Sequence, residues 1–296
     1  SLRLASKAPI RFLKRLLNEY KNMIINGKKI RDEILQQVKQ GVSELSFSPF
    51  FCDILVGTDL VSSQYVRMKG KTAESVGIKF RSAEFPESIT TEELIEQIQN
   101  LNRVPYMCGI IIQLPLPAHI DRNLVLNAID PKLDVDCLGS VTSAKFYNNE
   151  SSIEFPTASA CMKVLDSIDV DLSGKNIVVL GQGNLVGRPV AHLLRKRGFS
   201  VVTVNSKTEN IEMLMSGADV IISGMGHGKF ITGDKIKSGA IVIDAGTSEE
   251  NGAVVGDVDL DSVVSVASFV SPTPGGVGPV TIATLLDNVL QVAKKI

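Results

Sequence analysis

Two side chains suited to one chemical task stand one helical turn apart in the segment Tyr65-Val66-Arg67-Met68-Lys69. Residues four positions apart lie on the same face of a helix, so a phenol ring and an ammonium group would point into the same space. An aromatic ring can pack on a flat heterocycle, and a partly desolvated lysine can serve as acid and base. The pair is common by chance, so its surroundings must decide whether it forms a site.

A second candidate site is the glycine-rich turn Gly181-x-Gly183-x-x-x-Gly187, which follows the apolar segment 175–180 and precedes a helical pattern over 189–197. A strand, a turn and a helix in this order bring backbone N–H groups and a helix N-terminus to a pyrophosphate. The turn therefore predicts a dinucleotide site, with a tight turn that binds nothing as the alternative.

The residues that follow the next predicted strand bear on which dinucleotide binds. NAD-binding proteins commonly carry an acid about twenty residues after the glycines, for the ribose 2′-hydroxyl. This chain has Asn205-Ser206-Lys207-Thr208 there instead. A hydroxyl and a lysine suit the 2′-phosphate of NADP, and Arg188 is a second candidate cation. We therefore favour NADP over NAD, with Lys207 as a solvated surface lysine as the alternative.

The elements that must position these residues alternate between helix and strand. In the first half, apolar spacing predicts helices over 30–45, 62–76 and 91–101 and strands over 52–57, 79–85 and 109–113. After a polar stretch at 147–152, which predicts a linker, strands follow at 175–180, 201–204, 219–223 and 240–244 and a last helix at 281–292. This order predicts an α/β fold with two domains, the second a Rossmann-type domain.

Composition excludes several classes of protein. The 296 residues are 44% hydrophobic and 21% charged with a net charge of −1, which is typical of a soluble globular chain and gives no field for nucleic acid or a membrane surface. No apolar run approaches the ~18 residues of a membrane span. The cysteines form no metal-binding or redox motif, so we interpret them as reduced, buried thiols. They are Cys52, Cys108, Cys137 and Cys161.

The first 22 residues form a basic extension that differs from the rest of the chain, because six Lys or Arg residues face a single acid, Glu19. Three interpretations stay open: a remnant of an organellar transit sequence, an ordinary solvated helix, or an added upstream segment, since Met23 could be a natural start. The predicted location is cytoplasmic, or organellar if the transit interpretation holds.

From about Ile24 to its end, the chain resembles the methylenetetrahydrofolate dehydrogenase/cyclohydrolase family. Short-chain dehydrogenases also carry a Tyr and Lys pair, but there the glycine-rich turn comes before it in the chain. The similarity rests on segments that occur in the family's order: Ser62-x-x-Tyr65-Val66-x-x-Lys69-x-Lys71, the strand Gly109-Ile110-Ile111-Ile112-Gln113-Leu114-Pro115-Leu116-Pro117, Asp134-Val135-Asp136, Val186-Gly187-Arg188-Pro189, Gly256-Asp257-Val258-Asp259 and Pro272-Thr273-Pro274-Gly275-Gly276-Val277-Gly278-Pro279.

The resemblance implies a role for each matching residue. Lys69 would transfer the proton in cyclohydrolase chemistry and Gln113 would orient it. Tyr65 would stack along the pterin and p-aminobenzoate, and Asp136 would hydrogen-bond the amino edge of the pterin. Pro274, Gly275 and Gly276 would also contact the folate. The dinucleotide would be held by Gly181, Gln182, Gly183, Val186, Gly187, Arg188, Ser206, Lys207 and Thr247.

The resemblance also implies the organisation of the chain and its activity. A folate and catalytic domain would span 23–154 and a dinucleotide-binding domain 155–279, with a cleft between them, and the helix in 280–296 would pack back on the first domain. The expected enzyme is a homodimer of one-carbon metabolism, including purine biosynthesis. It would oxidise 5,10-methylenetetrahydrofolate with NADP and hydrolyse the 5,10-methenyl product to 10-formyltetrahydrofolate, without a metal.

Three departures from the family pattern keep alternatives open. Cys137 replaces a usual glycine, Thr157-Ala158-Ser159 replaces a usual Cys-Thr-Pro, and Gln182 replaces a usual arginine in the cofactor turn. NAD therefore remains a possible cofactor. The alternative functions are a monofunctional cyclohydrolase or dehydrogenase, and a dinucleotide-binding regulatory protein without catalysis.

Overall fold

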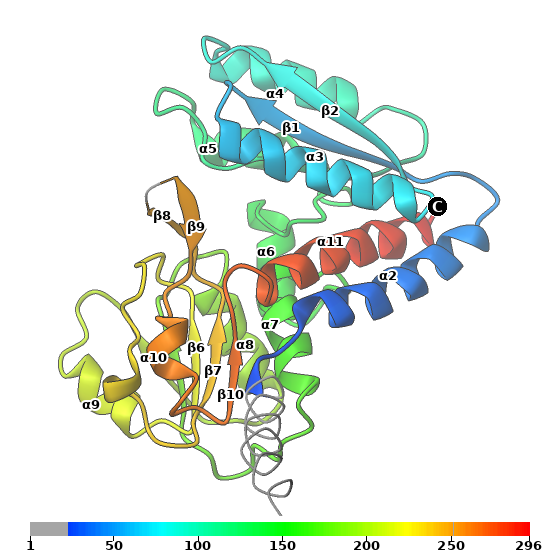
Figure 1. The fold of residues 1–296 in the computed structure, drawn as a ribbon. Helices are drawn as coiled ribbons and strands as arrows, with labels where there is room; N and C mark the ends of the chain where they lie inside the picture. The colour runs from blue at the N-terminus through cyan, green and yellow to red at the C-terminus, as the bar shows by residue number, and fades with distance from the viewer. Residues whose placement is uncertain (1–22, 251) are drawn as a thin grey trace, which may run out of the picture. The chain divides into compact units, whose positions relative to one another are not determined.

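The computed structural model describes residues 23–250 and 252–296, and the predicted basic extension over 1–22 lies outside them (Figure 1). The described chain forms two compact units. Residues 29–160 and 279–296 make one, and residues 23–28 and 161–278 make the other. Each contains a parallel β-sheet with helices between its strands, which confirms the predicted α/β class.

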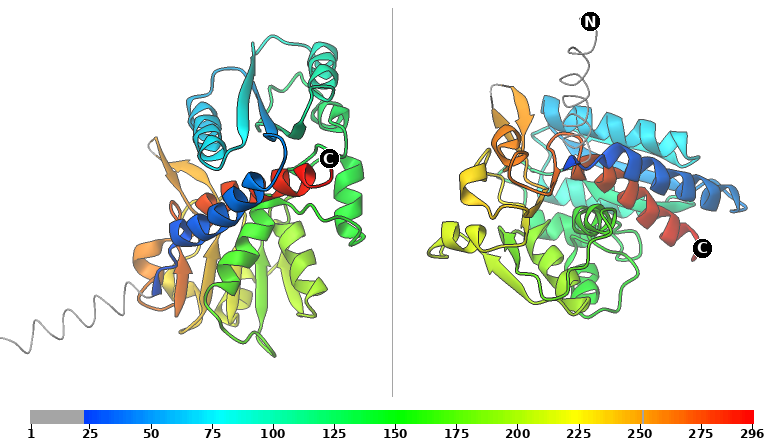
Figure 2. Two further views of the ribbon diagram at one scale, coloured as in Figure 1. Left: turned by 90° about the vertical axis from the view of Figure 1, so that its right-hand side faces the viewer. Right: turned by 60° about the horizontal axis from the view of Figure 1, so that its bottom comes forward.

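The sheet of the first unit has three parallel strands in the order β2-β1-β3. They are β1 (Phe50–Val56), β2 (Lys79–Phe85) and β3 (Met107–Ile112). Helices α3 (Leu60–Ser75) and α4 (Thr91–Leu101) lie on opposite faces of this sheet (Figure 2, left). Because β1 is central and covered on both faces, it needs a nearly continuous apolar sequence.

Capping residues explain where the two helices begin. The Asp59 carboxylate accepts a hydrogen bond from the Ser62 N–H at 2.7 Å, and α3 starts one residue after Asp59. At α4, Thr90 and Glu93 form a reciprocal capping box, because each side chain accepts a hydrogen bond from the other residue's N–H. Such caps satisfy N–H groups that have no partner within the helix, and they fix the direction of both helices.

Among the described residues, five further helices lie outside the segments of the sheet of the second unit: four within residues 27–166 and one near the end of the chain. They are α2 (Gly27–Ser43), α5 (Arg122–Ala128), α6 (Ser140–Tyr147), α7 (Pro156–Asp166) and α11 (Val277–Ala293). Helix α11 begins four residues before the predicted start at 281, because Pro279 lies in its first turn, where its missing N–H is not needed. The predicted linker at 147–152 is the end of α6 and the turn after it, and the two units divide further on, between Ala160 and Cys161.

The second unit has a five-stranded parallel sheet in the order β10-β7-β6-β4-β5. Its strands are β4 (Ile177–Leu180), β5 (Val201–Val204), β6 (Val220–Ser223), β7 (Ile241–Asp244) and β10 (Phe269–Ser271). Its helices are α8 (Gly187–Lys196), α9 (Ile211–Ser216), the short η1 (Gly233–Lys235) and α10 (Leu260–Val263). An antiparallel hairpin, β8 (Ser248–Glu250) and β9 (Ala253–Val255), projects from the sheet (Figure 1).

The strand order locates the ligand-binding edge of this sheet. The chain passes from β4 to β5 on one side and then to β6 on the other side of β4. Such a reversal is the point at which doubly wound α/β sheets bind ligands, beyond the carboxyl ends of the strands. Side chains of β4, β6, β7 and β10 pack with those of α9 and α10 in one buried apolar cluster, which holds the edge in place.

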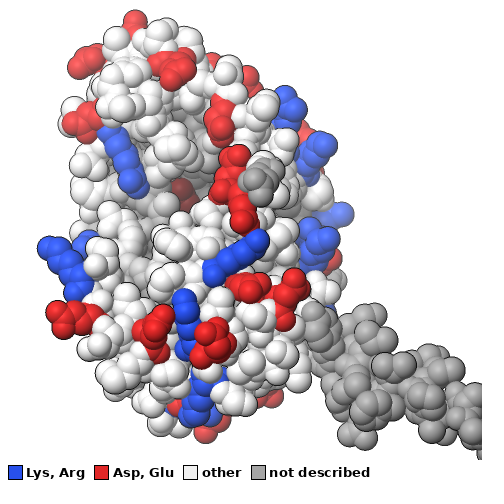
Figure 3. Space-filling model, turned by 60° about the vertical axis from the view of Figure 1, so that its left-hand side comes forward, with Lys and Arg blue, Asp and Glu red and all other residues white. Residues whose placement is uncertain are grey.

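The distribution of charged side chains and the state of the four cysteines agree with the sequence analysis. Acidic and basic side chains are interspersed on the face drawn in Figure 3, which shows no broad patch of one sign. All four cysteines are free and buried. Within residues 23–250 and 252–296, no helix combines the length and apolar character needed to cross a bilayer.

Candidate functional site

Lys69 is a buried lysine on α3 whose ammonium faces the end of β3. Its side chain is only 3% exposed, and Nζ lies 2.9 Å from Oε1 of Gln113. Gln113 is fixed at both ends, since its backbone N–H donates to Ile54 O at 2.8 Å and its Nε2 donates to Leu114 O at 2.9 Å. With its amide nitrogen engaged, Gln113 must present its oxygen to Lys69. The sheet therefore brings together two residues that the sequence analysis paired.

Tyr65 lies one turn before Lys69, and Nζ is 4.9 Å from the centre of its ring. Burial raises the pKa of the Tyr65 phenol, and the nearby carboxyls of Asp136 and Asp53 raise it further. The phenol is therefore neutral at physiological pH, and its ring offers a flat face beside the ammonium.

The two acids of the Asp134-Val135-Asp136 turn have different surroundings. The turn runs beside β3, where Ile110 N donates to Leu133 O at 2.9 Å. Asp134 accepts hydrogen bonds from the N–H groups of Gly139 at 2.8 Å and Leu138 at 3.3 Å. Asp136, which is partly exposed, accepts none from the described residues. Asp134 thus stabilises the turn, and Asp136 is the carboxyl available to a ligand.

The pKa of the Asp136 carboxyl is also raised above its ordinary value. Burial raises its pKa to about 7, Lys69 opposes this rise, and Asp134 and Asp53 add to it. The turn that carries it is held by Asn288 of α11, whose Nδ2 donates to Val135 O at 2.9 Å and to Glu154 O at 2.8 Å. A carboxyl fixed in this way can bind a ligand in either protonation state near neutral pH.

One residue of this cluster was missed by the sequence analysis. Asp53 lies in the middle of β1, is fully buried, and its Oδ2 is 2.6 Å from Lys69 Nζ. The sequence analysis predicts only a buried strand for residues 52–57. A charged residue inside an otherwise apolar run was the available signal, because a buried carboxyl requires a partner.

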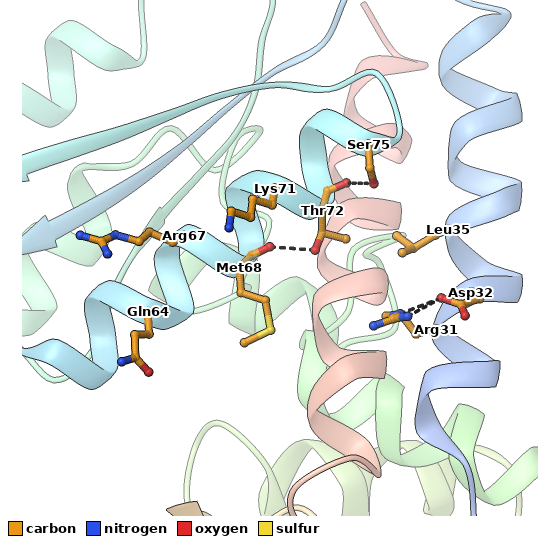
Figure 4. Close-up of a pocket in the computed structure, with 9 residues that line it drawn as sticks. All are labelled: Arg31, Asp32, Leu35, Gln64, Arg67, Met68, Lys71, Thr72 and Ser75. Carbon is orange, nitrogen blue, oxygen red and sulfur yellow. Dashed lines mark hydrogen bonds and ion pairs between the residues drawn. The ribbon is translucent and has the colours of Figure 1, made fainter. Parts of the chain in front are cut away.

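A separate groove of about 550 Å³ lies between α2 and α3 (Figure 4). It is lined by exposed and partly exposed side chains, among them Arg31, Leu35, Arg67 and Met68. None of the predicted site residues lines it. We therefore assign the candidate active site of this unit to the cluster around Lys69.

In the second unit, the glycine turn follows β4 at the edge that the strand order identifies. Gly181 has φ of +85°, a conformation that favours glycine. A Cβ atom at Gly187 would overlap the carbonyl oxygen of Gly181, whereas one at Gly183 would meet no atom within 4 Å. Close approach of the turn to α8 therefore needs Gly187, and the open side at Gly183 leaves room for a phosphate group.

The residues expected to determine the preference for NADP or NAD lie beside this turn. Leu180 pairs with Val204 in the parallel register, so the segments that follow β4 and β5 are neighbours. Ser206 and Lys207 are exposed there, in a turn where Lys207 N donates to Asn205 Oδ1 at 2.9 Å. Arg188 is exposed on α8. A hydroxyl and cations are the kinds of group that bind a phosphate, and a glycine turn before a helix is the kind of backbone that binds a pyrophosphate.

Other residues predicted to contact the cofactor or the folate lie in the same unit. Gln182 donates from Nε2 to Gly181 O at 2.6 Å, so its side chain folds back on the turn. Thr247 is exposed after β7. Pro274, Gly275 and Gly276 form the loop between β10 and α11, with Gly275 at φ of +105°.

Two buried acids behind these loops are further residues whose role the sequence analysis missed. Asp257 accepts hydrogen bonds from Ser223 Oγ at 2.6 Å, Met225 N at 2.8 Å and His227 N at 2.7 Å. Asp244 accepts from Gly246 N at 3.0 Å, and burial followed by the charge of Asp257 raises its pKa to about 7. The pair fixes the loops that leave β6 and β7. Among the described residues, no group of three or more His, Cys, Asp or Glu is placed to hold a metal ion.

Comparisons with known proteins agree with this geometry. The family model for the tetrahydrofolate dehydrogenase/cyclohydrolase catalytic domain matches residues 25–136, and that for the NAD(P)-binding domain matches residues 156–296. Bifunctional protein FolD of Vesicomyosocius okutanii subsp. Calyptogena okutanii (strain HA) is 43% identical over 268 residues, which cover 90% of this chain and 97% of that protein.

Two solved structures share the fold over most of their length. The bifunctional FolD methylenetetrahydrofolate dehydrogenase/cyclohydrolase of Campylobacter jejuni superposes with a TM-score of 0.87 at 36% identity, covering 92% of this chain and 98% of that one. The Trypanosoma brucei methylenetetrahydrofolate dehydrogenase-cyclohydrolase, solved with NADP and an inhibitor, also has a TM-score of 0.87, at 35% identity over 92% of this chain and 97% of that one.

Fold and site together define a two-unit α/β enzyme with a Rossmann-type dinucleotide unit and a lysine-centred site in the other unit. With both family models matched over most of its length, the chain belongs to the tetrahydrofolate dehydrogenase/cyclohydrolase family. This confirms the resemblance found in the sequence.

Proposed function

We propose that this protein oxidises 5,10-methylenetetrahydrofolate to 5,10-methenyltetrahydrofolate with NADP, and hydrolyses that product to 10-formyltetrahydrofolate. The observation that carries the proposal is the buried Lys69, whose Nζ is 2.9 Å from Gln113 Oε1 and 4.9 Å from the ring centre of Tyr65. Membership of the family and the dinucleotide turn at Gly181 to Gly187 support the same conclusion.

For the hydrolytic step, the cluster supplies a proton-transfer group and a platform. Lys69 would exchange a proton with the water that attacks the methenyl carbon, or with the nitrogen released as the ring opens. Gln113 would hold Nζ in place for that exchange. Tyr65 would lie along the pterin, and Asp136 would accept hydrogen bonds from its amino edge.

For the oxidative step, bound NADP supplies a nicotinamide that accepts a hydride from the methylene carbon. This chain would contribute binding and orientation. The turn Gly181 to Gly187 would hold the pyrophosphate, and Ser206, Lys207 and Arg188 would hold the 2′-phosphate. Gln182, Val186 and Thr247 would line the rest of the cofactor site, and Pro274, Gly275 and Gly276 would contact the folate.

The direct test is to mix the purified protein with 5,10-methylenetetrahydrofolate and either NADP or NAD, and to follow the reduced dinucleotide and the folate products together. We expect reduced cofactor with NADP preferred, followed by 10-formyltetrahydrofolate. Absence of reduced dinucleotide with both cofactors would refute the oxidative assignment. Accumulation of the methenyl compound at its spontaneous rate of hydrolysis would refute the cyclohydrolase assignment.

Two further expectations rest on the family resemblance and on the sequence. We expect a homodimer, which sedimentation of the purified protein would test. We also expect a cytoplasmic location, with an organelle as the alternative if the basic segment 1–22 acts as a transit sequence, which imaging of the tagged protein would test.

A further inference from the structure

Asp53 is the only charged residue in β1, whose sequence is Phe-Phe-Cys-Asp-Ile-Leu-Val. The strand is central in its sheet, and the Asp53 side chain has no exposed surface. An unpaired carboxylate in such a place is strongly disfavoured, and a stabilising partner must therefore be close. An apolar residue would fill this position without that penalty, which suggests that the acid serves a purpose other than stability.

The partner is Lys69. Its Nζ lies 2.6 Å from Asp53 Oδ2 and 2.9 Å from Gln113 Oε1, so a carboxylate and an amide oxygen both face the lysine. Among the described residues, neither Asp53 oxygen has a partner with good hydrogen-bond geometry, and Oδ1 has no ion-pair partner either. Burial raises the pKa of the Asp53 carboxyl, and the attraction of Lys69 opposes that rise. The contact is therefore mainly electrostatic, and it joins Asp53 to the residue assigned to proton transfer.

In the part of the chain that the structure describes, the other ionisable groups around Lys69 form no ion pair with it or carry no charge. Tyr65, from the same helix, is a neutral phenol. Asp136 feels the charge of Lys69 but makes no ion pair with it among the described residues, and the charges of Asp134 and Arg122 also act on Asp136. Asp53 is thus the one described carboxyl at ion-pair distance from Lys69.

We propose that Asp53 is the counter-ion of Lys69: it favours the ammonium form of the lysine and so sets the pH range in which Lys69 exchanges a proton with the substrate. The identity of that substrate rests on the proposed function, whereas the pairing does not. Asp53 acts through Lys69 and is a positioning residue. An opposite charge at this distance shifts the midpoint of a group's titration by about one to three pH units.

The first test needs neither folate nor dinucleotide. The unaltered protein is labelled with ¹⁵N-lysine and with ¹³C at the aspartate carboxyls, and the Lys69 signal is assigned by its loss in Lys69→Arg. We expect the Lys69 and Asp53 signals to respond in the same pH steps, because each charge feels the other. Independent responses would overturn the proposal, and so the result stands even if Asp53→Asn fails to fold.

The second test compares the pH dependence of methenyltetrahydrofolate hydrolysis in the unaltered protein and in Asp53→Asn. Removal of the counter-ion should move the limb assigned to Lys69 toward lower pH by about one unit or more, whether Lys69 acts as acid or base. Dehydrogenase turnover should change less, since its hydride transfer needs no proton from Lys69. An unchanged profile would overturn the proposal.

Asp59→Asn is the matched control. It removes an exposed carboxylate at the start of the same helix, and asparagine still caps the helix. This variant should keep the profile of the unaltered protein. A shift as large as that of Asp53→Asn would show that the general loss of negative charge, and not the ion pair, causes the effect. If the unaltered protein does not hydrolyse the methenyl compound, the proposed function fails, and the nuclear magnetic resonance titration still decides the pairing.

Discussion

Nζ of Lys69 and Oε1 of Gln113 lie 2.9 Å apart although 44 positions separate the two residues in the chain. The contact exists because α3 packs on the sheet in which β3 ends beside β1, and Gln113 N is bonded to Ile54 O of that strand. A hydrogen bond to an ammonium group restricts its position strongly. Gln113 should therefore matter for proton transfer and little for stability.

Gln113→Leu should lower the rate of methenyltetrahydrofolate hydrolysis by about 100-fold, because Lys69 loses the acceptor that orients it. Oxidation of methylenetetrahydrofolate should fall less. Steady-state assays of both activities on one preparation would measure the difference. Gln64→Leu, a change of an exposed glutamine on α3, the helix that carries Lys69, is the control. Equal losses of both activities would argue for a general structural role of Gln113.

The raised pKa of Asp136 should make the stability of the folded protein depend on pH. Burial raises its pKa from an ordinary 3.8 to about 7, so the native state binds this proton more tightly than the unfolded chain does. The stabilisation that comes from binding this proton is fully present below pH 3.8, the carboxyl's pKa in the unfolded chain. It is lost as the pH rises through about 7, the pKa in the native state. Asp136→Asn keeps the shape of the side chain and cannot ionise.

The variant should match the unaltered protein at about pH 4 and exceed it at about pH 8, by at most about 4 kcal/mol in the free energy of unfolding. Water at this partly exposed carboxyl reduces that figure. Urea unfolding at both pH values is the measurement. A difference of the same size at both would contradict the assigned titration. The folate KM should also rise, since an amide is a weaker acceptor than a carboxylate.

The last two glycines of the dinucleotide turn should respond differently to alanine. Gly187→Ala would force a methyl group onto the carbonyl oxygen of Gly181, so we expect destabilisation of about 1–3 kcal/mol and loss of NADP binding. Gly183→Ala meets no atom within 4 Å, and its stability should stay within about 0.5 kcal/mol while NADP affinity falls. Thermal unfolding and NADP titration would measure both effects. Similar melting temperatures for the two variants would contradict the close approach at Gly187.

Lys207→Ala tests the choice of dinucleotide. If its ammonium binds the 2′-phosphate, the KM for NADP should rise about 10-fold or more while the KM for NAD stays unchanged, as expected for one charge-assisted hydrogen bond. Lys196→Ala, which removes another exposed lysine of the same unit, should leave both values unchanged. Parallel losses with NADP and NAD would show that Lys207 does not contact the 2′-phosphate.

Local sequence signals predicted most of the secondary structure. The bounds of α4, β2 and β5 agree with the sequence analysis. A threonine cap marks the start of α4, polar and apolar residues are interspersed along β2, and β5 is a short apolar run. The hairpin β8–β9 was missed, because its residues Ser248 to Val255 show little apolar alternation. Helices α5 and α6 were missed because they are short and their periodicity is weak.

The site was predicted where family motifs name its residues and missed where tertiary packing creates a contact. Asp53 and Lys69 meet only because α3 folds back on β1, and no local pattern indicates that pairing. The replacement of a usual glycine by Cys137 has a visible effect: the residue has φ of +62°, in the region that glycine adopts without strain. Motif similarity alone gave no such information.

The central claim is that Lys69 serves the hydrolytic step and not the oxidative one. The most direct measurement supplies methylenetetrahydrofolate and NADP to the unaltered protein and to Lys69→Met, and follows NADPH, the methenyl compound and 10-formyltetrahydrofolate together. We predict that Lys69→Met still forms NADPH but accumulates the methenyl compound, which then hydrolyses at the spontaneous rate. Formation of 10-formyltetrahydrofolate by Lys69→Met at the rate of the unaltered protein would contradict the account.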